Sequence, residues 1–274
     1  MGVLPIGIVT KNRVPYLDVT LRSLSATSLP TAAPLIVFDD CSDTDTQRYY
    51  REDSCLSATT VWPTGDRWRN LSLGDIGTEL MPKPVGVKGR VAVVSSRKSH
   101  GVVGASCLAA CHLFDKFPAA SGIMLLQDDV VFNADWYVRM QATLAEPSLF
   151  EGKHPGLLAG MKLNQKFKNP KRKVVQSGIT AQCLYISRKA FNACELFFRK
   201  VHTKRNRFDD SLRNAVAAKG MWAGCMLPFV CQHIGIDSLV RPGRKWFSRS
   251  GGRIGYHSNP PYAMSDSVRK FVSE

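Results

Sequence analysis

Short apolar runs that end in polar residues recur along the first half of the chain and predict a set of buried strands. They occupy residues 5–10, 35–38, 91–94 and 122–126. Continuous apolar runs of this length are typical of parallel strands that are buried on both faces. We therefore expect these four segments to form the core of a parallel sheet.

Segments with helical periodicity lie between some of these strands. Three leucines share one face of a helix predicted over residues 14–25, and a second helix is predicted over residues 103–117. The order strand, helix, strand is the unit of a doubly wound sheet. Residues 43–90 show no clear period, so we expect an irregular excursion there.

The second half of the chain has a less regular pattern. It predicts, in chain order, a helix at 136–145, a strand at 156–161, an apolar segment at 182–186, helices at 188–201 and 209–219, and an apolar stretch at 226–231. No internal repeat occurs. The whole pattern favours one α/β domain, which the length of 274 residues also fits.

Composition narrows the class of protein further. With 44% hydrophobic and 22% charged residues, the chain can bury a proper core. It has no run of about 18 apolar residues and no signal-peptide pattern, which predicts a cytoplasmic protein without a transmembrane segment. Its eight cysteines include no Cys-x-x-Cys pair, so we expect thiols rather than a disulfide framework.

The positive charge is distributed unevenly. The net charge is +15, yet residues 1–137 hold 13 Lys and Arg against 14 Asp and Glu, whereas residues 138–274 hold 24 against 8. Such asymmetry predicts an anionic partner bound to the second half: nucleic acid, a membrane surface or an acidic glycan.

Two of the predicted strands end in paired carboxylates, Asp39-Asp40 and Asp128-Asp129. In open α/β sheets ligands bind at the carboxyl ends of the strands. Adjacent acids repel unless a cation or hydrogen-bond donors compensate, and a hard divalent ion often takes one or two carboxylates together with phosphate oxygens. Asp128-Asp129 therefore suggests a metal–diphosphate site; the alternative is a helix-capping Asp beside a solvated one.

The stretch IGIVTKNR at residues 6–13 resembles the opening of glycosyltransferases of the GT-A fold, in particular the family 2 and N-acetylglucosaminyltransferase I types. LLQDDV at residues 125–130 resembles their DxD motif, and QHIG at residues 232–235 resembles their late metal-binding histidine. The resemblance covers the first half well and the second half only through short motifs. It implies a Rossmann-like, mixed and mainly parallel sheet with flanking helices, with residues 1–137 binding the nucleotide sugar and residues 138–274 the acceptor.

The resemblance also implies roles for single residues. Asp129 and His233 would bind Mn²⁺ or Mg²⁺, and Asp128 would contact the ribose or a metal-bound water. The residues expected to bind the nucleotide of a sugar donor such as a UDP-sugar are Thr10, Asn12, Arg13, Asp39 or Asp40, and Gln127. An isolated histidine after an apolar run can equally be a core residue. Since the chain has only Ser99-His100-Gly101 where such enzymes carry an Asn-x-Gly-x-x-x-Ala-Arg-Asn stretch, the donor nucleotide stays open.

An inverting transfer needs a base that takes the proton of the acceptor hydroxyl. The family keeps an acidic pair near a helix start in its second half, and Asp209-Asp210 fits this pattern. We expect Asp209 first and Asp210 second to act as the base, although an Asp at that position is also an ordinary helix cap.

Three basic clusters interleaved with aromatic residues predict the acceptor. They span residues 162–173, 199–207 and 241–253, with aromatic residues that include Phe167, Phe208, Trp246, Phe247 and Tyr256. Cations with stacking rings are typical of nucleic-acid surfaces. Our preferred acceptor is a hydroxymethylated pyrimidine in DNA, as for bacteriophage enzymes that modify their own genomes. The alternatives are an anionic envelope glycan or lipid-linked acceptor, and a DNA-binding protein that has lost catalysis.

Overall fold

A computed structural model describes residues 2–30, 32–52, 59–62, 91–161, 173–176, 178–199 and 208–233. The elements up to residue 132 are β1 (Ile6–Thr10), α1 (Val14–Ser25), β2 (Leu35–Asp39), α2 (Thr44–Glu52), β3 (Thr59–Trp62), β4 (Val91–Ser96), α3 (Gly101–Lys116), β5 (Gly122–Gln127) and β6 (Val130–Phe132). The later elements are α4 (Trp136–Leu144), the 3-10 helix η3 (Pro147–Phe150), β7 (Pro155–Ala159), β8 (Val174–Val175), β9 (Cys183–Ser187), α5 (Arg188–Ala193), α6 (Glu195–Arg199), α7 (Phe208–Ala218), β10 (Trp222–Met226) and β11 (Cys231–His233).

Nine strands form one mixed sheet in the order β3-β4-β2-β1-β5-β9-β7-β10-β8. The first five strands in this order run parallel to one another. β9 is antiparallel to both of its neighbours, β5 and β7, whereas β10 is parallel to β7 and antiparallel to β8. The sheet therefore joins strands from both halves of the chain, and the expected mixed, mainly parallel sheet is confirmed.

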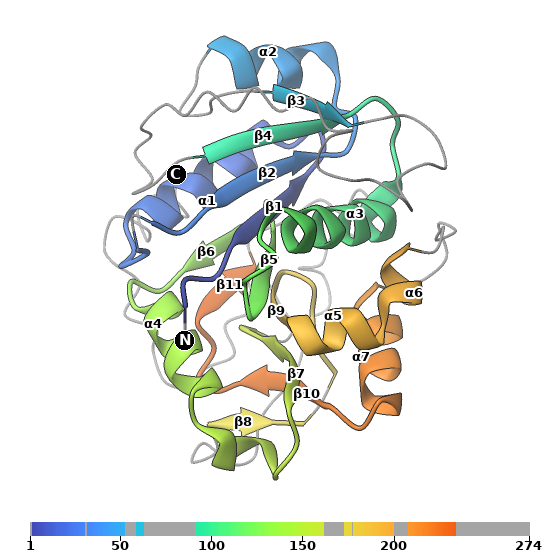
Figure 1. Cartoon of the computed structure of the whole chain (residues 1–274). Coiled ribbons are helices and arrows are strands. Elements are labelled where there is room, and N and C mark those ends of the chain that lie inside the picture. Colours follow the sequence, from blue (N-terminus) through green and yellow to red (C-terminus); the bar gives the residue numbers. More distant parts are fainter. Residues whose placement is uncertain are drawn as a thin grey trace, which may run out of the picture.

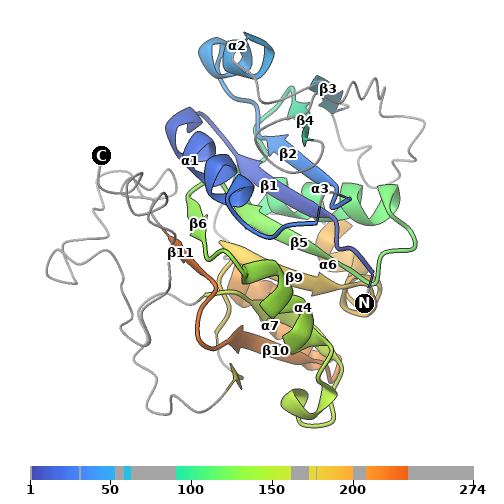
Figure 2. The same ribbon diagram turned by 90° about the vertical axis from the view of Figure 1, so that its left-hand side faces the viewer.

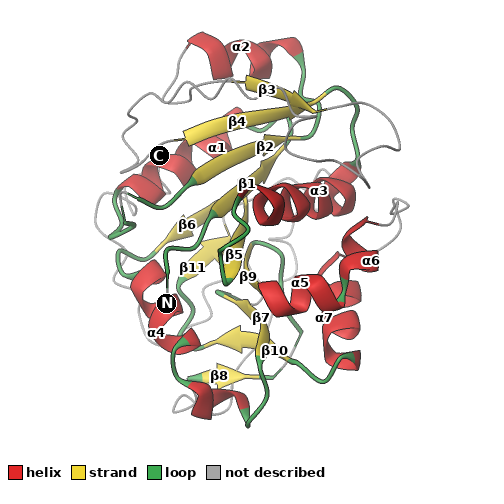
Figure 3. Cartoon of the chain, viewed as in Figure 1, coloured by secondary structure: helices red, strands yellow, loops and turns green. Residues whose placement is uncertain are grey.

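Helices cover both faces of this sheet. α3, α5, α6 and α7 lie on one face, on the right of Figure 1. Figure 2 looks at the other face, where α1 and α4 lie in front together with the two-stranded ribbon of β6 and β11. Figure 3 separates the strands of the sheet from these two helical layers by colour. The strands between the layers are buried along their whole length, as in β1, β2 and β9.

Helix α1 connects the sheet to the β6–β11 ribbon. Leu17, Leu21 and Leu24 are buried, as their spacing predicts. The hydroxyls of two other residues of α1 bond the free edge of β6: Thr20 accepts a hydrogen bond from the Val130 N–H at 3.1 Å, and Ser23 accepts one from Phe132 at 2.7 Å. Because buried N–H groups need partners, these bonds fix where β6 begins.

The predicted elements were confirmed wherever the pattern was strong. The helix over residues 14–25 has those bounds, and the four apolar runs of the first half became β1, β2, β4 and β5 with shifts of one or two residues. The prediction for residues 43–90 was wrong in part, because α2 and β3 lie there; residues 53–58 and 63–90 fall outside the described part. The predicted helix over residues 188–201 is divided at Cys194 into α5 and α6.

The structure also bears on the predicted state of the cysteines and on one predicted aromatic residue of the acceptor surface. The seven cysteines of the described part are thiols that form no disulfide, as expected. Phe208, predicted to be a stacking ring at the acceptor surface, is instead only 2% exposed and packs beside Phe197. Among the described residues no helix is long and apolar enough to cross a membrane.

Candidate active site

Asp128 and Asp129 occupy the turn between β5 and β6, where the central strand of the sheet ends. Both are 3% exposed. The hydroxyl of Thr10, at the end of the neighbouring strand β1, donates a hydrogen bond to Asp128 Oδ2 at 2.7 Å. The β5 turn thus holds two buried carboxylates side by side.

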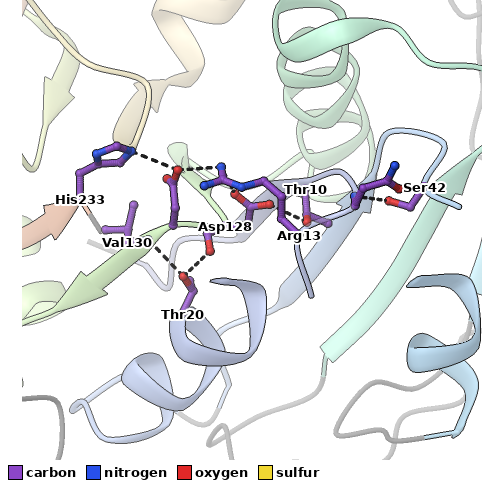
Figure 4. A network of polar contacts seen from close by, with 9 residues as sticks. Thr10, Arg13, Thr20, Ser42, Asp128, Val130 and His233 are labelled. Carbon is purple, nitrogen blue, oxygen red and sulfur yellow. Dashed lines mark hydrogen bonds and ion pairs between the residues drawn. The ribbon is translucent and has the colours of Figure 1, made fainter. Parts of the chain in front are cut away.

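Arg13 bridges the two acids. Its Nη1 lies 3.0 Å from Asp128 Oδ1 and 2.7 Å from Asp129 Oδ2. Arg13 is the N-cap of α1, three residues after the end of β1, so the turn between β1 and α1 places a cation at the end of β5. Figure 4 shows Thr10, Arg13, Asp128 and His233 converging from separate elements. The sequence predicted a nucleotide contact for Arg13, and the structure adds this ion pair.

His233 reaches the same cluster from the end of the described chain. Its Nε2 lies 3.0 Å from Asp129 Oδ2. β11 pairs antiparallel with β6 and places His233 opposite Val130, the residue after Asp129. The predicted proximity of the late histidine to the acid pair is therefore present in the structure.

The two acids differ in proton affinity. Burial raises the pKa of Asp128 to about 7, and the neighbouring charge of Asp129 adds to this, while Arg13 and the Thr10 hydroxyl oppose it. Burial also acts on Asp129, but the contacts with His233 and Arg13 outweigh it and hold the pKa of Asp129 below its usual value. Asp129 is therefore the carboxylate that stays ionised most readily, which a metal ligand requires.

The other predicted acid pair is arranged differently. Asp39 is fully buried and accepts hydrogen bonds from the Ser42 hydroxyl, from Gln47 Nε2 at 2.6 Å and from the Tyr50 hydroxyl at 3.0 Å. Burial raises the pKa of Asp39 despite these bonds. In this structure the side chain ties the β2 end to α2, and its predicted contact with the nucleotide stays a prediction.

Asp40 caps helix α3 from a neighbouring strand. Its carboxylate accepts hydrogen bonds from the backbone N–H groups of His100 at 2.6 Å and Gly101 at 2.9 Å, and from the Ser99 hydroxyl at 2.9 Å. These N–H groups belong to the first turn of the helix, which has no side-chain cap of its own at His100. Asp40 thus neutralises the positive end of the α3 dipole.

Asn12 and Gln127 lie beside the cluster. Asn12 has a left-handed backbone, with φ of 51°, and joins two turns: its N–H donates to Ser42 Oγ at 2.8 Å and its side-chain oxygen accepts from the Asp43 N–H at 2.7 Å. Gln127 is the last residue of β5, and its N–H donates to the Gln182 carbonyl at 3.0 Å. Their predicted contacts with the donor stay predictions.

The predicted base belongs to a helix of the second half of the chain. Asp209 and Asp210 are in the first turn of α7, where the Asp210 N–H donates to Asp209 Oδ1 at 2.9 Å. Figures 1 and 2 place α7 on the opposite face of the sheet from the β6–β11 ribbon that carries His233. The structure brings five predicted residues together, namely Thr10, Arg13, Asp128, Asp129 and His233, and the role of Asp209 and Asp210 stays a prediction.

Thr20 is a site residue that the sequence analysis missed. Its hydroxyl donates to the Asp128 carbonyl at 2.7 Å while it accepts from the Val130 N–H. It therefore holds the backbone on both sides of Asp129. A threonine within an apolar helix face gives no signal of such a role, because the same residue can bond its own helix.

The residues fit a divalent ion in part. An octahedral ion of the magnesium type keeps ligands at about 2.1 Å, which places neighbouring ligand atoms about 3 Å apart. Asp129 Oδ2 and His233 Nε2 have this spacing, and Asp129 Oδ1 is buried without a hydrogen-bond partner among the described residues. No group of three His, Cys, Asp or Glu side chains in that same part could hold a metal by itself. Phosphate or water oxygens would have to complete the shell.

Comparisons with known proteins bear on the fold. No family model matches the sequence, and the comparison with curated proteins also gives no match. Residues 1–349 of S. aureus TarS match 84% of this chain and 59% of their own, with 12% identity and a TM-score of 0.50. The complex of that protein with UDP-GlcNAc gives 13% identity, 84% and 57% coverage and a TM-score of 0.52.

A second protein has the same fold. The mannosyltransferase PcManGT from Pyrobaculum calidifontis, solved with GDP-Man and Mn²⁺, matches 83% of this chain and 55% of its own at 15% identity, with a TM-score of 0.51. This chain thus spans 59% of the TarS fragment, 36% of the longer TarS chain and 55% of PcManGT. Identities this low establish the fold alone, and the expected GT-A architecture is confirmed.

Proposed function

We propose that this protein is a metal-dependent glycosyltransferase that moves a sugar from a nucleoside diphosphate sugar to an acceptor hydroxyl. One observation carries the proposal: a buried acid pair ends the central strand β5, and His233 contacts Asp129 at 3.0 Å. The proposal is supported by a fold shared with proteins solved with UDP-GlcNAc and with GDP-Man and Mn²⁺.

Each residue of the cluster has a role in this proposal. Asp129 and His233 hold Mn²⁺ or Mg²⁺, and Asp128 binds the ribose or a metal-bound water. The bound metal supplies Lewis-acid neutralisation of the departing diphosphate. Further contacts with the donor are proposed for Thr10, Asn12, Arg13, Gln127 and either Asp39 or Asp40.

The proposed base of an inverting transfer is Asp209, with Asp210 as the second choice. Two readouts, turnover and donor binding, test this role. Asp209→Asn should lower turnover about 100-fold or more while donor binding stays unchanged. Unchanged turnover would remove Asp209 from the reaction without affecting the metal site.

The proposed acceptor is a hydroxymethylated pyrimidine in DNA, and its support is the charge of residues 138–274, with 24 Lys and Arg against 8 Asp and Glu. Of the three basic clusters, only Lys173 and Arg199 belong to the described residues. A base in a duplex would have to leave the stack to reach the cluster. The alternative acceptor is an anionic envelope glycan or a lipid-linked glycan.

Mass spectrometry tests donor and acceptor together. The protein is incubated with Mn²⁺, a panel of nucleotide sugars, and hydroxymethylated DNA or anionic glycans in separate reactions. We expect a hexose or pentose mass shift on the DNA that EDTA abolishes. A shift only on a glycan would replace the acceptor but keep the enzyme class, whereas salt-sensitive DNA binding without turnover of any donor would favour a non-catalytic binding protein.

A further inference from the structure

Arg13 already neutralises the acid pair from within the chain. Its Nη1 atom contacts Asp128 Oδ1 at 3.0 Å and Asp129 Oδ2 at 2.7 Å, and its side chain is 13% exposed. A charge-assisted contact of this length is strong where water is largely excluded. The guanidinium thus provides the positive charge that two adjacent buried carboxylates require.

The same oxygen of Asp129 serves two partners. Oδ2 contacts both Arg13 Nη1 and His233 Nε2. A carboxylate oxygen has two lone-pair positions, so both are in use. The other oxygen, Oδ1, is buried and has no hydrogen-bond partner within the described ranges. A cation that binds Asp129 beside His233 therefore lies close to the guanidinium, and the two positive charges compete for one carboxylate.

The guanidinium of Arg13 is supported by an aromatic ring and has an unused donor. Its guanidinium lies 4.3 Å from the centre of the Tyr16 ring, which supports the planar group from one side. Nη2 is buried and lacks a hydrogen-bond acceptor in the part of the chain that the structure describes. A guanidinium with a spare donor matches the geometry of a phosphate oxygen.

We propose that Arg13 is an internal counter-cation that competes with the divalent metal for Asp129 and is released to the diphosphate of the donor. This inference rests on the proposed function. Metal alone competes with the guanidinium for Asp129 and lies near its positive charge, whereas metal with a diphosphate gives Arg13 an anionic partner. The two ligands therefore bind cooperatively, and Arg13 is the source of the coupling.

Electron paramagnetic resonance of Mn²⁺ tests this coupling without any turnover. The affinity for Mn²⁺ is measured with and without UDP in the wild type, in Arg13→Gln and in Arg22→Gln. Arg22 is the matched control, because it lies in α1, the helix that follows Arg13, and pairs with Asp18 while its side chain is 56% exposed. We expect Arg13→Gln to bind Mn²⁺ about 10-fold more tightly in the absence of UDP, since the competing cation is gone.

The effect of UDP completes the test. We expect UDP to raise the Mn²⁺ affinity about 10-fold or more in the wild type and in Arg22→Gln, but less than about 3-fold in Arg13→Gln. Equal Mn²⁺ affinities in Arg13→Gln and the wild type would overturn the inference and leave the proposed function intact. No Mn²⁺ binding by any of the three proteins, even with UDP, would instead overturn the metal site itself.

A second variant covers the case in which Arg13→Gln does not fold. Arg13→Lys keeps the positive charge but loses the planar guanidinium that lies over the Tyr16 ring. Its Mn²⁺ affinity without UDP should lie between those of the wild type and Arg13→Gln, and Mn²⁺ should raise its melting temperature more than that of the wild type. An affinity below that of the wild type would contradict competition by Arg13.

Discussion

His233 and Asp129 are 104 residues apart in the chain, yet Nε2 of the histidine lies 3.0 Å from Oδ2 of the aspartate. The contact follows from strand register, because β11 pairs with β6 so that His233 faces Val130. A slip of one residue would turn the histidine to the other face of the ribbon. The ribbon therefore sets the distance between the two proposed metal ligands.

Replacing the histidine should weaken metal binding. We expect His233→Gln to lower the affinity for Mn²⁺ about 10-fold or more, because an imidazole ligand is lost from the shell. His154→Gln is the control, since His154 is exposed ahead of β7. Titration of the free Mn²⁺ signal measures both variants, and equal affinities in the two would remove His233 from the site.

Thr20 should prove to be a positioning residue. Thr20→Val keeps the shape but removes the hydroxyl that bonds the Asp128 carbonyl and the Val130 N–H. Leaving buried polar groups without partners costs about 1–3 kcal/mol, and we expect a loss of unfolding free energy in this range. Urea denaturation measures this loss. Ser25→Ala is the control, because the Ser25 hydroxyl donates to the Arg22 carbonyl of its own helix. A loss equal to that of the control would contradict the role.

Asp40 is expected to stabilise the folded protein. Asp40→Ala should lower the unfolding free energy by about 1–2 kcal/mol, since the first turn of α3 loses its carboxylate cap. Asp135→Ala is a matched control: Asp135 stands at the N-cap of α4 but makes no capping bond. Equal stability of the two variants in urea would show that the Asp40 bonds contribute nothing. A large loss of UDP affinity in Asp40→Ala would in addition support its predicted contact with the donor.

Much of this arrangement could be predicted from the apolar pattern of the sequence, and some of it could not. Parallel strands end at one edge of a sheet, so acids after β2 and β5 had to lie near each other. The two pairs nevertheless look alike in sequence. Asp39 and Asp40 are satisfied by neutral donors and a helix end, whereas Asp128 and Asp129 are satisfied by Arg13 and His233. Those partners come from other elements, which a local pattern does not reveal.

The sequence analysis did not predict the β6–β11 ribbon, for a related reason. β6 and β11 have three residues each, too few for a periodic pattern. Their pairing and the hydroxyls of α1 define them instead. His233 was found only through the resemblance of its surroundings to a known family. Basic clusters in residues 162–172, 200–207 and 241–253 lie outside the described part, so the acceptor side of the proposal still rests on charge.

Buried His112 should make stability depend on pH. Its side chain is 5% exposed, packs edge-on against Phe38, and has no hydrogen-bond partner for either ring nitrogen among the described residues. Burial lowers the pKa of His112 from 6.5 to about 4. Between these values the unfolded chain binds the proton and the folded chain does not, so stability falls as pH decreases from 6.5 to 4.

The size of this effect can be measured against a variant. At about 1.4 kcal/mol per pKa unit, the loss attributable to His112 is roughly 3 kcal/mol. Urea denaturation at pH 7.0 and pH 4.5 should show a smaller pH-dependent loss in His112→Leu than in the wild type. The same loss in both proteins would mean that His112 is not the group responsible.

Calorimetric titration of UDP in the presence of Mn²⁺ tests the central claim most directly, with the wild type and Asp129→Asn compared and Asp135→Asn as a control at an exposed acid. The account predicts that the wild type and the control bind UDP, that EDTA weakens this binding about 100-fold, and that Asp129→Asn loses the metal dependence. UDP binding of equal strength with Mn²⁺ and with EDTA, unchanged in Asp129→Asn, would contradict a metal–diphosphate site at the end of β5.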